Sequence, residues 1–76
     1  MAESGDHMKF KKEDKWHTRM AVLRAYTGKK QAKICDENGF DKKAYSNWER
    51  GLRMPEPQNK ARIAAALGAT VEEIWG

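Results

Sequence analysis

The apolar residues of the chain recur at helical spacing once the first dozen positions are passed. Residues 1–12 have no apolar period, and we expect them to form a disordered leader. A first helix is then indicated by four apolar residues at intervals of three or four, namely Trp16, Met20, Leu23 and Tyr26. Gly28 ends this helix, because glycine readily takes the left-handed conformation just past a helix C-terminus.

A second, shorter helix is predicted from about Lys30 to Asn38, with Ile34 and Cys35 as its apolar side. Gly39 follows at once and ends the helix sharply, since glycine adopts a left-handed backbone without steric cost. We expect the next residue, Phe40, to turn inward.

The third predicted helix extends over residues 42–50, and Asp41 is a suitable N-cap for it. Its two faces differ in character. Tyr45, Trp48 and Leu52 are spaced at i, i+3 and i+7, so we expect them to face the core. The second face is polar and its only charges are positive, and it consists of Lys43, Ser46, Asn47 and Arg50. A loop with two prolines follows this helix.

Two further helices complete the pattern. The fourth is predicted over residues 58–67, and the residues expected to face inward are Ala61, Ala64 and Leu67. Thr70 and Glu73 have the spacing of a capping box, which opens a short fifth helix. The apolar residues of that helix are Val71, Ile74 and Trp75. No segment has the pattern of a strand, so the expected fold class is all-α: a compact bundle of about five short helices over residues 13–76.

Composition and charge narrow the function. The 76 residues suffice for one small domain and leave no room for a deep enzyme pocket. No nucleophile–base pair or cluster of paired carboxylates occurs, so no catalytic residue is predicted. The single cysteine, Cys35, and the isolated histidines His7 and His17 predict neither a metal site nor a cofactor. The net charge of +4 favours a polyanionic partner, although charge also serves solubility.

The N-terminal leader contains basic residues of its own. Its opening MAESGDHM is typical of a cloning remnant, with the junction at His7-Met8. Lys9, Lys11 and Lys12 either form a basic arm along a DNA groove or belong to a tail without function. With no secretory signal and no apolar run long enough to span a membrane, we expect a cytoplasmic protein.

Residues 31–51 combine two short helices with a tight glycine turn, which is typical of a helix-turn-helix unit. The slim residues Ile34 and Cys35 suit the place where two steeply crossed helices touch, and Phe40 fills the space between them. The second helix of the pair then has an outward face that fits a DNA major groove about 12 Å wide.

With these residues in place, the chain resembles the lambda-repressor-like helix-turn-helix family of Cro and phage repressors. The resemblance covers residues 23–74 and rests on the joint spacing of Leu23-Arg24, Gln31, Ile34-Cys35, Gly39-Phe40-Asp41, Tyr45-Ser46, Trp48-Glu49-Arg50-Gly51, Pro55, Ile63-Ala64, Leu67-Gly68 and Ile74. Three positions depart from the family pattern: Cys35 replaces alanine, Lys60 replaces an apolar residue, and Pro57 starts the fourth helix.

The resemblance implies a sequence-specific transcriptional regulator, a repressor by expectation, that binds an operator in double-stranded DNA as a homodimer. The family's base-contacting positions match the first two turns of the third helix, which hold Lys42, Lys43, Ser46 and Asn47. Gln31 matches a phosphate anchor at the start of the second helix. The further phosphate candidates are Lys30, Arg50 and Arg53. Arg24 and Glu49 match an internal ion pair of the family.

Each of these features has a plainer interpretation. The basic face is also consistent with solvated lysines, Gln31 with an ordinary surface glutamine, and Arg24 and Glu49 with unrelated surface charges. At the level of function, one alternative is an antitoxin-type module that binds a partner protein as well as DNA. Another is the docking domain of a larger nucleic-acid enzyme. A small co-purifying protein distinguishes the first alternative, and the flanking sequence of the gene distinguishes the second.

Overall fold

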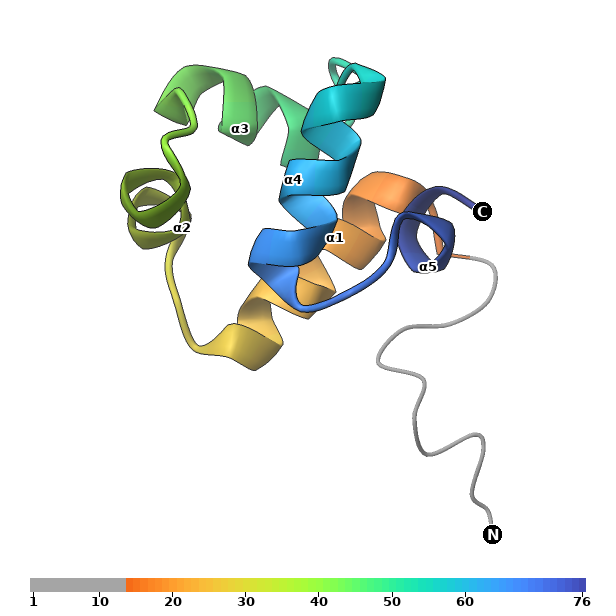
Figure 1. Ribbon diagram of the computed structural model, residues 1–76, viewed down its shortest axis with the longest axis horizontal. Coiled ribbons are helices and arrows are strands. Elements are labelled where there is room, and N and C mark those ends of the chain that lie inside the picture. Colours follow the sequence, from red (N-terminus) through yellow and green to blue (C-terminus); the bar gives the residue numbers. More distant parts are fainter. Residues whose placement is uncertain (1–13) are drawn as a thin grey trace, which may run out of the picture.

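The structure, a computed structural model, describes residues 14–76 of the chain. This part contains five helices: α1 (Trp16–Thr27), α2 (Gln31–Asn38), α3 (Lys42–Glu49), α4 (Pro57–Leu67) and α5 (Val71–Trp75) (Figure 1). Residues 14–76 include no strand, which confirms the predicted all-α bundle. The predicted leader over residues 1–12, with its three lysines Lys9, Lys11 and Lys12, lies outside the described residues.

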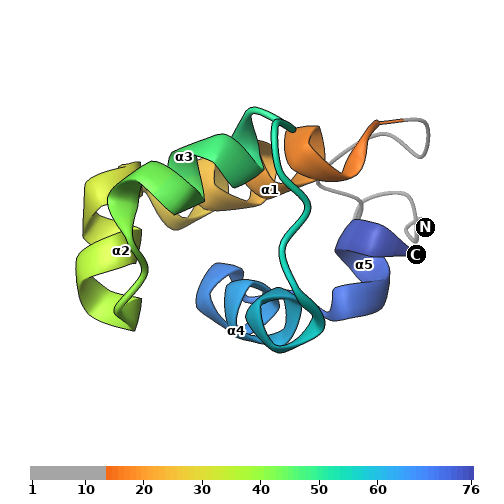
Figure 2. The ribbon, with the colours of Figure 1, turned by 90° about the horizontal axis from the view of Figure 1, so that it is seen from above.

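The five helices enclose one hydrophobic core. α1 packs against α3, α4 and α5, while α2 packs against α3 and α4. Viewed as in Figure 2, α1 and α3 form one side of the molecule, and α4 and α5 form the opposite side. The buried hydrophobic residues between them are Met20, Leu23, Ile34, Cys35, Phe40, Tyr45, Trp48, Ile63, Ala64, Leu67 and Ile74. Removing these side chains from water is the main favourable contribution to folding.

The turn between α2 and α3 is set by one glycine and one capping carboxylate. Gly39 has a φ of 72°, and its N–H donates to the carbonyl of Cys35 at 2.8 Å, which closes the last turn of α2. Asp41 then accepts the N–H of Ala44 at 2.9 Å and caps the start of α3. The predicted glycine turn and N-cap of the helix-turn-helix unit are therefore confirmed.

Phe40 fills the space between α2 and α3, as predicted. It is 7% exposed. Its ring stacks against Tyr45 and meets Trp48 edge-on, with centroid separations of 5.7 Å in both cases. Since Tyr45 and Trp48 are on the inner side of α3, this aromatic cluster fixes the turn to the third helix.

The apolar stripe of α1 ends differently from the prediction. Tyr26 is 64% exposed, so its assignment to the buried face is wrong. Three full helical turns take about eleven residues, which puts Thr27 rather than Tyr26 in line with Trp16. Thr27 is half-buried, and its hydroxyl donates to the carbonyl of Arg24.

Two other residues assigned to the core are also exposed. Leu52 is 61% exposed because α3 ends at Glu49 and the chain turns at Gly51, so helical spacing no longer applies there. Ala61 is exposed because the buried stripe of α4 is centred roughly a third of a turn away from it. That stripe consists of Ile63, Ala64 and Leu67.

Lys60, the polar departure from the family pattern, lies in the same stripe of α4 at helical spacing from Ile63 and Leu67. It is half-buried, and its amino group lies 5.5 Å from the centroid of the Trp75 ring. Trp75 in turn packs against Trp16, with their ring centroids 6.2 Å apart. The lysine stem thus covers apolar surface while its charge rests on an aromatic face, so the packing of α4 accommodates the departure.

Side chains fix both ends of the short helix α5. Thr70 accepts the N–H of Glu73, and the Glu73 carboxylate accepts the N–H of Thr70, which confirms the predicted capping box. At the other end, Arg19 of α1 donates to the carbonyl of Glu73 at 3.1 Å. These contacts hold a helix of five residues in place.

We expect Cys35 to resist thiol reagents in the folded protein. The residue is 1% exposed, and burial raises the pKa of its thiol, so little thiolate is present at a given pH. Alkylation by iodoacetamide at mildly alkaline pH should be slow in buffer and reach the rate of a free thiol in denaturant. Labelling of the native protein at the free-thiol rate contradicts the buried position.

Candidate nucleic-acid interface

α3 separates buried from accessible side chains along its length. Its buried residues are Tyr45, Trp48 and Glu49. What we term the outer face of α3 consists of the exposed Lys42 and Lys43, the half-buried Ser46 and Asn47, and the exposed Arg50, which follows as the C-cap residue. Residues three and four positions apart share one side of a helix, so this face presents amide, hydroxyl and cationic donors together. All the residues predicted to contact bases belong to it.

Acidic residues of α2 pair with nearby lysines, one of which is at the start of α3. Lys42 Nζ lies 3.5 Å from Asp36 Oδ1, and both side chains are well exposed. Glu37 accepts a hydrogen bond from Lys29 at 2.6 Å and lies near Lys33, and the Lys29 bond lowers the pKa of Glu37. Exposed ion pairs of this kind contribute little to stability, so Lys42 exchanges its partner at low cost.

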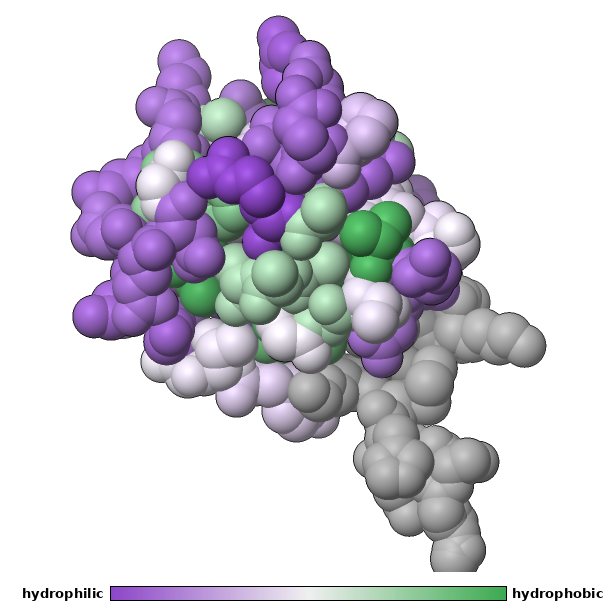
Figure 3. Space-filling view, in the orientation of Figure 1, coloured by the Kyte–Doolittle hydropathy of each residue, from purple (hydrophilic) through white to green (hydrophobic). Residues whose placement is uncertain are grey.

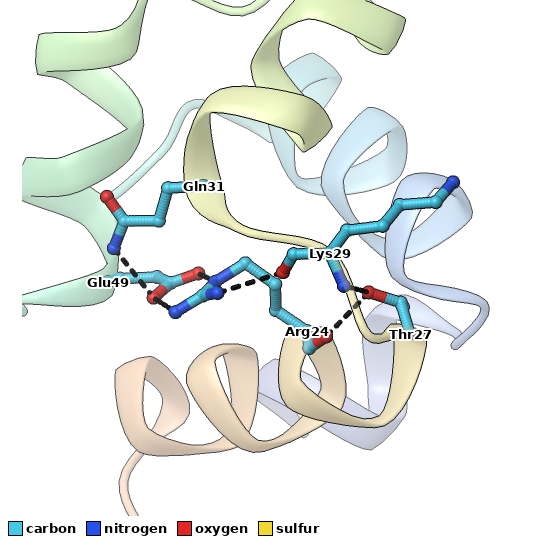
Figure 4. Close-up of polar contacts among 5 residues, drawn as sticks. All are labelled: Arg24, Thr27, Lys29, Gln31 and Glu49. Atoms are coloured by element: carbon cyan, nitrogen blue, oxygen red, sulfur yellow. Dashed lines mark hydrogen bonds and ion pairs between the residues drawn. The ribbon is translucent and has the colours of Figure 1, made fainter.

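Behind the outer face, one carboxylate joins three helices (Figure 4). Glu49 of α3 is 8% exposed. Arg24 of α1 donates to it twice, from Nε to Oε2 at 2.7 Å and from Nη2 to Oε1 at 3.2 Å. Gln31, the first residue of α2, donates from Nε2 to Oε1 at 3.0 Å. The hydrogen bond to Glu49 raises the pKa of Arg24, so the guanidinium stays charged at physiological pH.

Tyr45 is a neutral core residue. It is fully buried, and burial, reinforced by the negative charge of Glu49, raises the pKa of its hydroxyl far above the physiological range. It therefore contributes packing to the inner side of α3 and no titrating group.

The N-terminus of α2 lacks a side-chain cap. Lys30 is the N-cap residue but makes no capping hydrogen bond, and the first turn contains no acidic residue. The first N–H groups of a helix have no intrahelical partner, and together with the helix dipole they attract anions. The Gln31 amide has two N–H groups, of which the bond to Glu49 uses one. The second is able to donate to an anion at the same helix end.

Arg50 and Arg53 are exposed where α3 ends and the next loop begins. The backbone between them is fixed. Gly51 has a φ of 74°, and the ring of His17 lies so close that an added Cβ would come within 2.6 Å of it. Further along, Pro55 is buried. Arg50, at the end of the outer face of α3, and Arg53, just beyond it, thus lie on a segment with a defined backbone.

Two contacts of the helix-turn-helix unit escaped the sequence analysis. One is the bond from Gln31 to Glu49, which joins residues 18 positions apart. The other is made by Arg62 of α4, which donates to the carbonyl of Asn38 at the end of α2. Helical spacing relates residues within one helix only, so neither contact has a signal in the pattern.

The surface of the molecule is unevenly polar. In Figure 3, hydrophilic residues gather over α2, α3 and the loop that follows, and a paler hydrophobic area lies over α4, where Ala61 and Ala65 are exposed. Among residues 14–76, no helix has both the length and the apolar character that a membrane span requires. The same residues include no group of three or more His, Cys, Asp or Glu placed to hold a metal ion.

Comparison with known proteins agrees with this architecture. No protein-family model matches the chain. The chain is similar to the cryptic phage CTXphi transcriptional repressor RstR of Vibrio cholerae serotype O1, with 34% identity over 58 residues. The match covers 76% of this chain and 52% of the repressor, so the chain spans about half the length of the relative. The five-helix fold and this similarity confirm the resemblance to helix-turn-helix proteins of the phage-repressor type inferred from the sequence.

Proposed function

We propose that the chain, with residues 13–76 as its folded domain, regulates transcription in the cytoplasm by binding an operator in double-stranded DNA. The observation that carries the proposal is the outer face of α3, where basic and amide side chains lie over a buried network that fixes α3 to the start of α2. The similarity to a phage transcriptional repressor supports repression, by occupancy of the operator and without catalysis, as the mode of action.

On DNA, the two ends of the helix-turn-helix unit have different tasks. Lys42, Lys43, Ser46 and Asn47 contact base edges in the major groove, where lysine donates to guanine and asparagine pairs with adenine. The N-terminus of α2 binds a backbone phosphate through its free N–H groups, and the second N–H of Gln31 donates to the same phosphate. Lys30, Arg50 and Arg53 neutralise neighbouring phosphates. Glu49 thereby orients Gln31 for its phosphate contact.

We expect binding to duplex DNA to weaken steeply with salt. If Lys30, Arg50 and Arg53 each neutralise one phosphate, log K falls with log salt at a slope of about −2.7 per half-site. Fluorescence anisotropy with a labelled operator over a range of potassium chloride concentrations measures the slope. Lys60→Gln is the control, because that lysine lies over Trp75 and should leave the slope unchanged. An affinity that does not respond to salt contradicts the proposed interface.

In-vitro selection from a random duplex pool gives the operator sequence, and the symmetry of that sequence indicates the oligomeric state of the protein on DNA. We propose a homodimer, so the selected motif should contain two inverted half-sites about one helical turn apart. A single half-site without symmetry contradicts the dimer. The antitoxin alternative requires a small partner protein that co-purifies with the chain, and no contact among residues 14–76 favours it.

A further inference from the structure

Arg62 of α4 makes two contacts with the turn of the helix-turn-helix unit and lies close to a third residue of it. Its Nη2 donates to the carbonyl of Asn38, the last residue of α2, at 2.7 Å. Its guanidinium lies 4.8 Å from the centroid of the Phe40 ring. The same Nη2 is 3.8 Å from the position that a Cβ on Gly39 would occupy. On its own helix, Nη1 donates to Asn59 Oδ1 at 3.3 Å, which aims the guanidinium across the gap between helices.

These contacts act on the segment that sets the angle between α2 and α3. Asn38, Gly39 and Phe40 are the residues through which the chain passes from one helix to the other. On one side, Phe40 is held by the aromatic residues of α3. On the other side, Arg62 places a positive charge at the C-terminus of α2, where the helix dipole is negative and the last carbonyls lack intrahelical partners.

Operator binding requires this angle to be fixed. In the proposed function, the start of α2 binds a phosphate while α3 contacts bases, so one rigid unit must satisfy two sites on the duplex at once. The hydrogen bonds of Glu49 to Arg24 and Gln31 connect the end of α3 to α1 and to the start of α2. At the turn between α2 and α3, the contacts of Arg62 connect the unit to α4.

We propose that Arg62 is a positioning residue for DNA binding, which clamps the turn between α2 and α3 from outside the unit without touching DNA. The inference rests on the proposed function and adds to it a residue of α4 that none of the predicted contacts includes. It distinguishes Arg62 from Arg50 and Arg53, which are phosphate contacts in the same proposal.

Arg62→Ala tests this role against a matched control. Arg19→Ala is the control, because it removes the same charge and a similar arginine-to-carbonyl bond, but at the end of α5. At a temperature well below both unfolding midpoints, Arg62→Ala should weaken binding to the selected operator about fivefold, within the range of indirect coupling effects. The salt slope should stay as in the unmodified protein, since no phosphate contact is lost. Arg19→Ala should change affinity by less than about twofold.

Amide hydrogen exchange gives a readout that does not depend on DNA. The N–H groups of Gly39 and Phe40 donate to the Cys35 carbonyl, and both should exchange faster in Arg62→Ala while those of α1 do not.

Unchanged exchange of these N–H groups together with unchanged operator affinity overturns the proposed role of Arg62. A salt slope reduced by about one unit shows instead a phosphate contact and also overturns it. An equal loss of operator affinity in Arg19→Ala shows a general effect of removing a positive charge, and this result also overturns the proposed role of Arg62. If the unmodified protein selects no operator, the proposed function fails, and the exchange experiment still decides the clamp.

Discussion

Glu49→Ala should destabilise the fold by about 3 kcal/mol, which is the lower end of the range for a broken buried ion pair. The Glu49 side chain is only 4% exposed, whereas Arg24 is 21% exposed and also donates to the carbonyl of Lys29 at 3.0 Å. Removing the carboxylate therefore leaves a charged guanidinium that is largely buried but keeps one acceptor. Gln31 loses its acceptor at the same time. Urea denaturation followed by tryptophan fluorescence measures the change in the unfolding midpoint.

A matched control separates burial from the mere presence of an ion pair. Glu37 also bonds a lysine at 2.6 Å, but it is exposed, and Glu37→Ala should leave the midpoint almost unchanged. In a double variant, Arg24→Met with Glu49→Leu, part of the lost stability should return, because no uncompensated charge stays buried. A midpoint for Glu49→Ala equal to that of the unmodified protein rules out an energetically coupled buried pair.

Asn47→Ala and Arg53→Ala should affect DNA binding in different ways. A bidentate contact of asparagine to adenine contributes about 1 to 3 kcal/mol of discrimination, so Asn47→Ala should relax the preference at one position of each half-site by roughly 5- to 150-fold. Arg53 contacts phosphate in the proposal, and phosphates look alike at every step of the duplex. Its replacement should weaken binding to all sequences by a similar factor and reduce the salt slope by about one unit.

The measurement is a panel of single-base variants of the selected operator, titrated with each protein variant. Asn47 lies on the half-buried part of the outer face, and alanine favours the helix, so loss of folding should not confuse the result. An equal loss across the panel for Asn47→Ala means that bases are contacted by other residues of α3. If Arg53→Ala changes the base preference, Arg53 contacts a base and not a phosphate.

The sequence was sufficient to predict the helices and the helix-turn-helix unit, because their signals are local. Spacing, the N-cap Asp41 and the glycine after α2 all act within a few residues of one another. The wrong assignments, Tyr26, Leu52 and Ala61, concern which side of an element its neighbours cover. Leu52 follows a helix that had already ended, and Ala61 is small enough to be placed on either side of α4. The pattern of apolar residues along one helix does not indicate which of its sides a neighbouring helix covers.

The candidate site was predictable to a similar extent and for the same reason. The outer face of α3 follows from the period of one helix. The bonds from Gln31 to Glu49 and from Arg62 to Asn38 depend on how three helices meet, and they join residues 18 and 24 positions apart. Polar partners at such separations are interchangeable in a sequence pattern, since several lysines and arginines are available for each carboxylate or carbonyl.

The division of α3 into two sides has a consequence for the evolution of such proteins. Tyr45, Trp48 and Glu49 are the buried residues of α3, whereas Lys43 is exposed and Ser46 and Asn47 are half-buried. In the proposed function, replacements at Lys43, Ser46 or Asn47 therefore alter operator preference and leave the buried residues of α3 in place. If that proposal holds, a lineage built on this helix acquires new target sites by single substitutions, without passing through an unfolded intermediate sequence. Related repressors with different operators are the expected outcome.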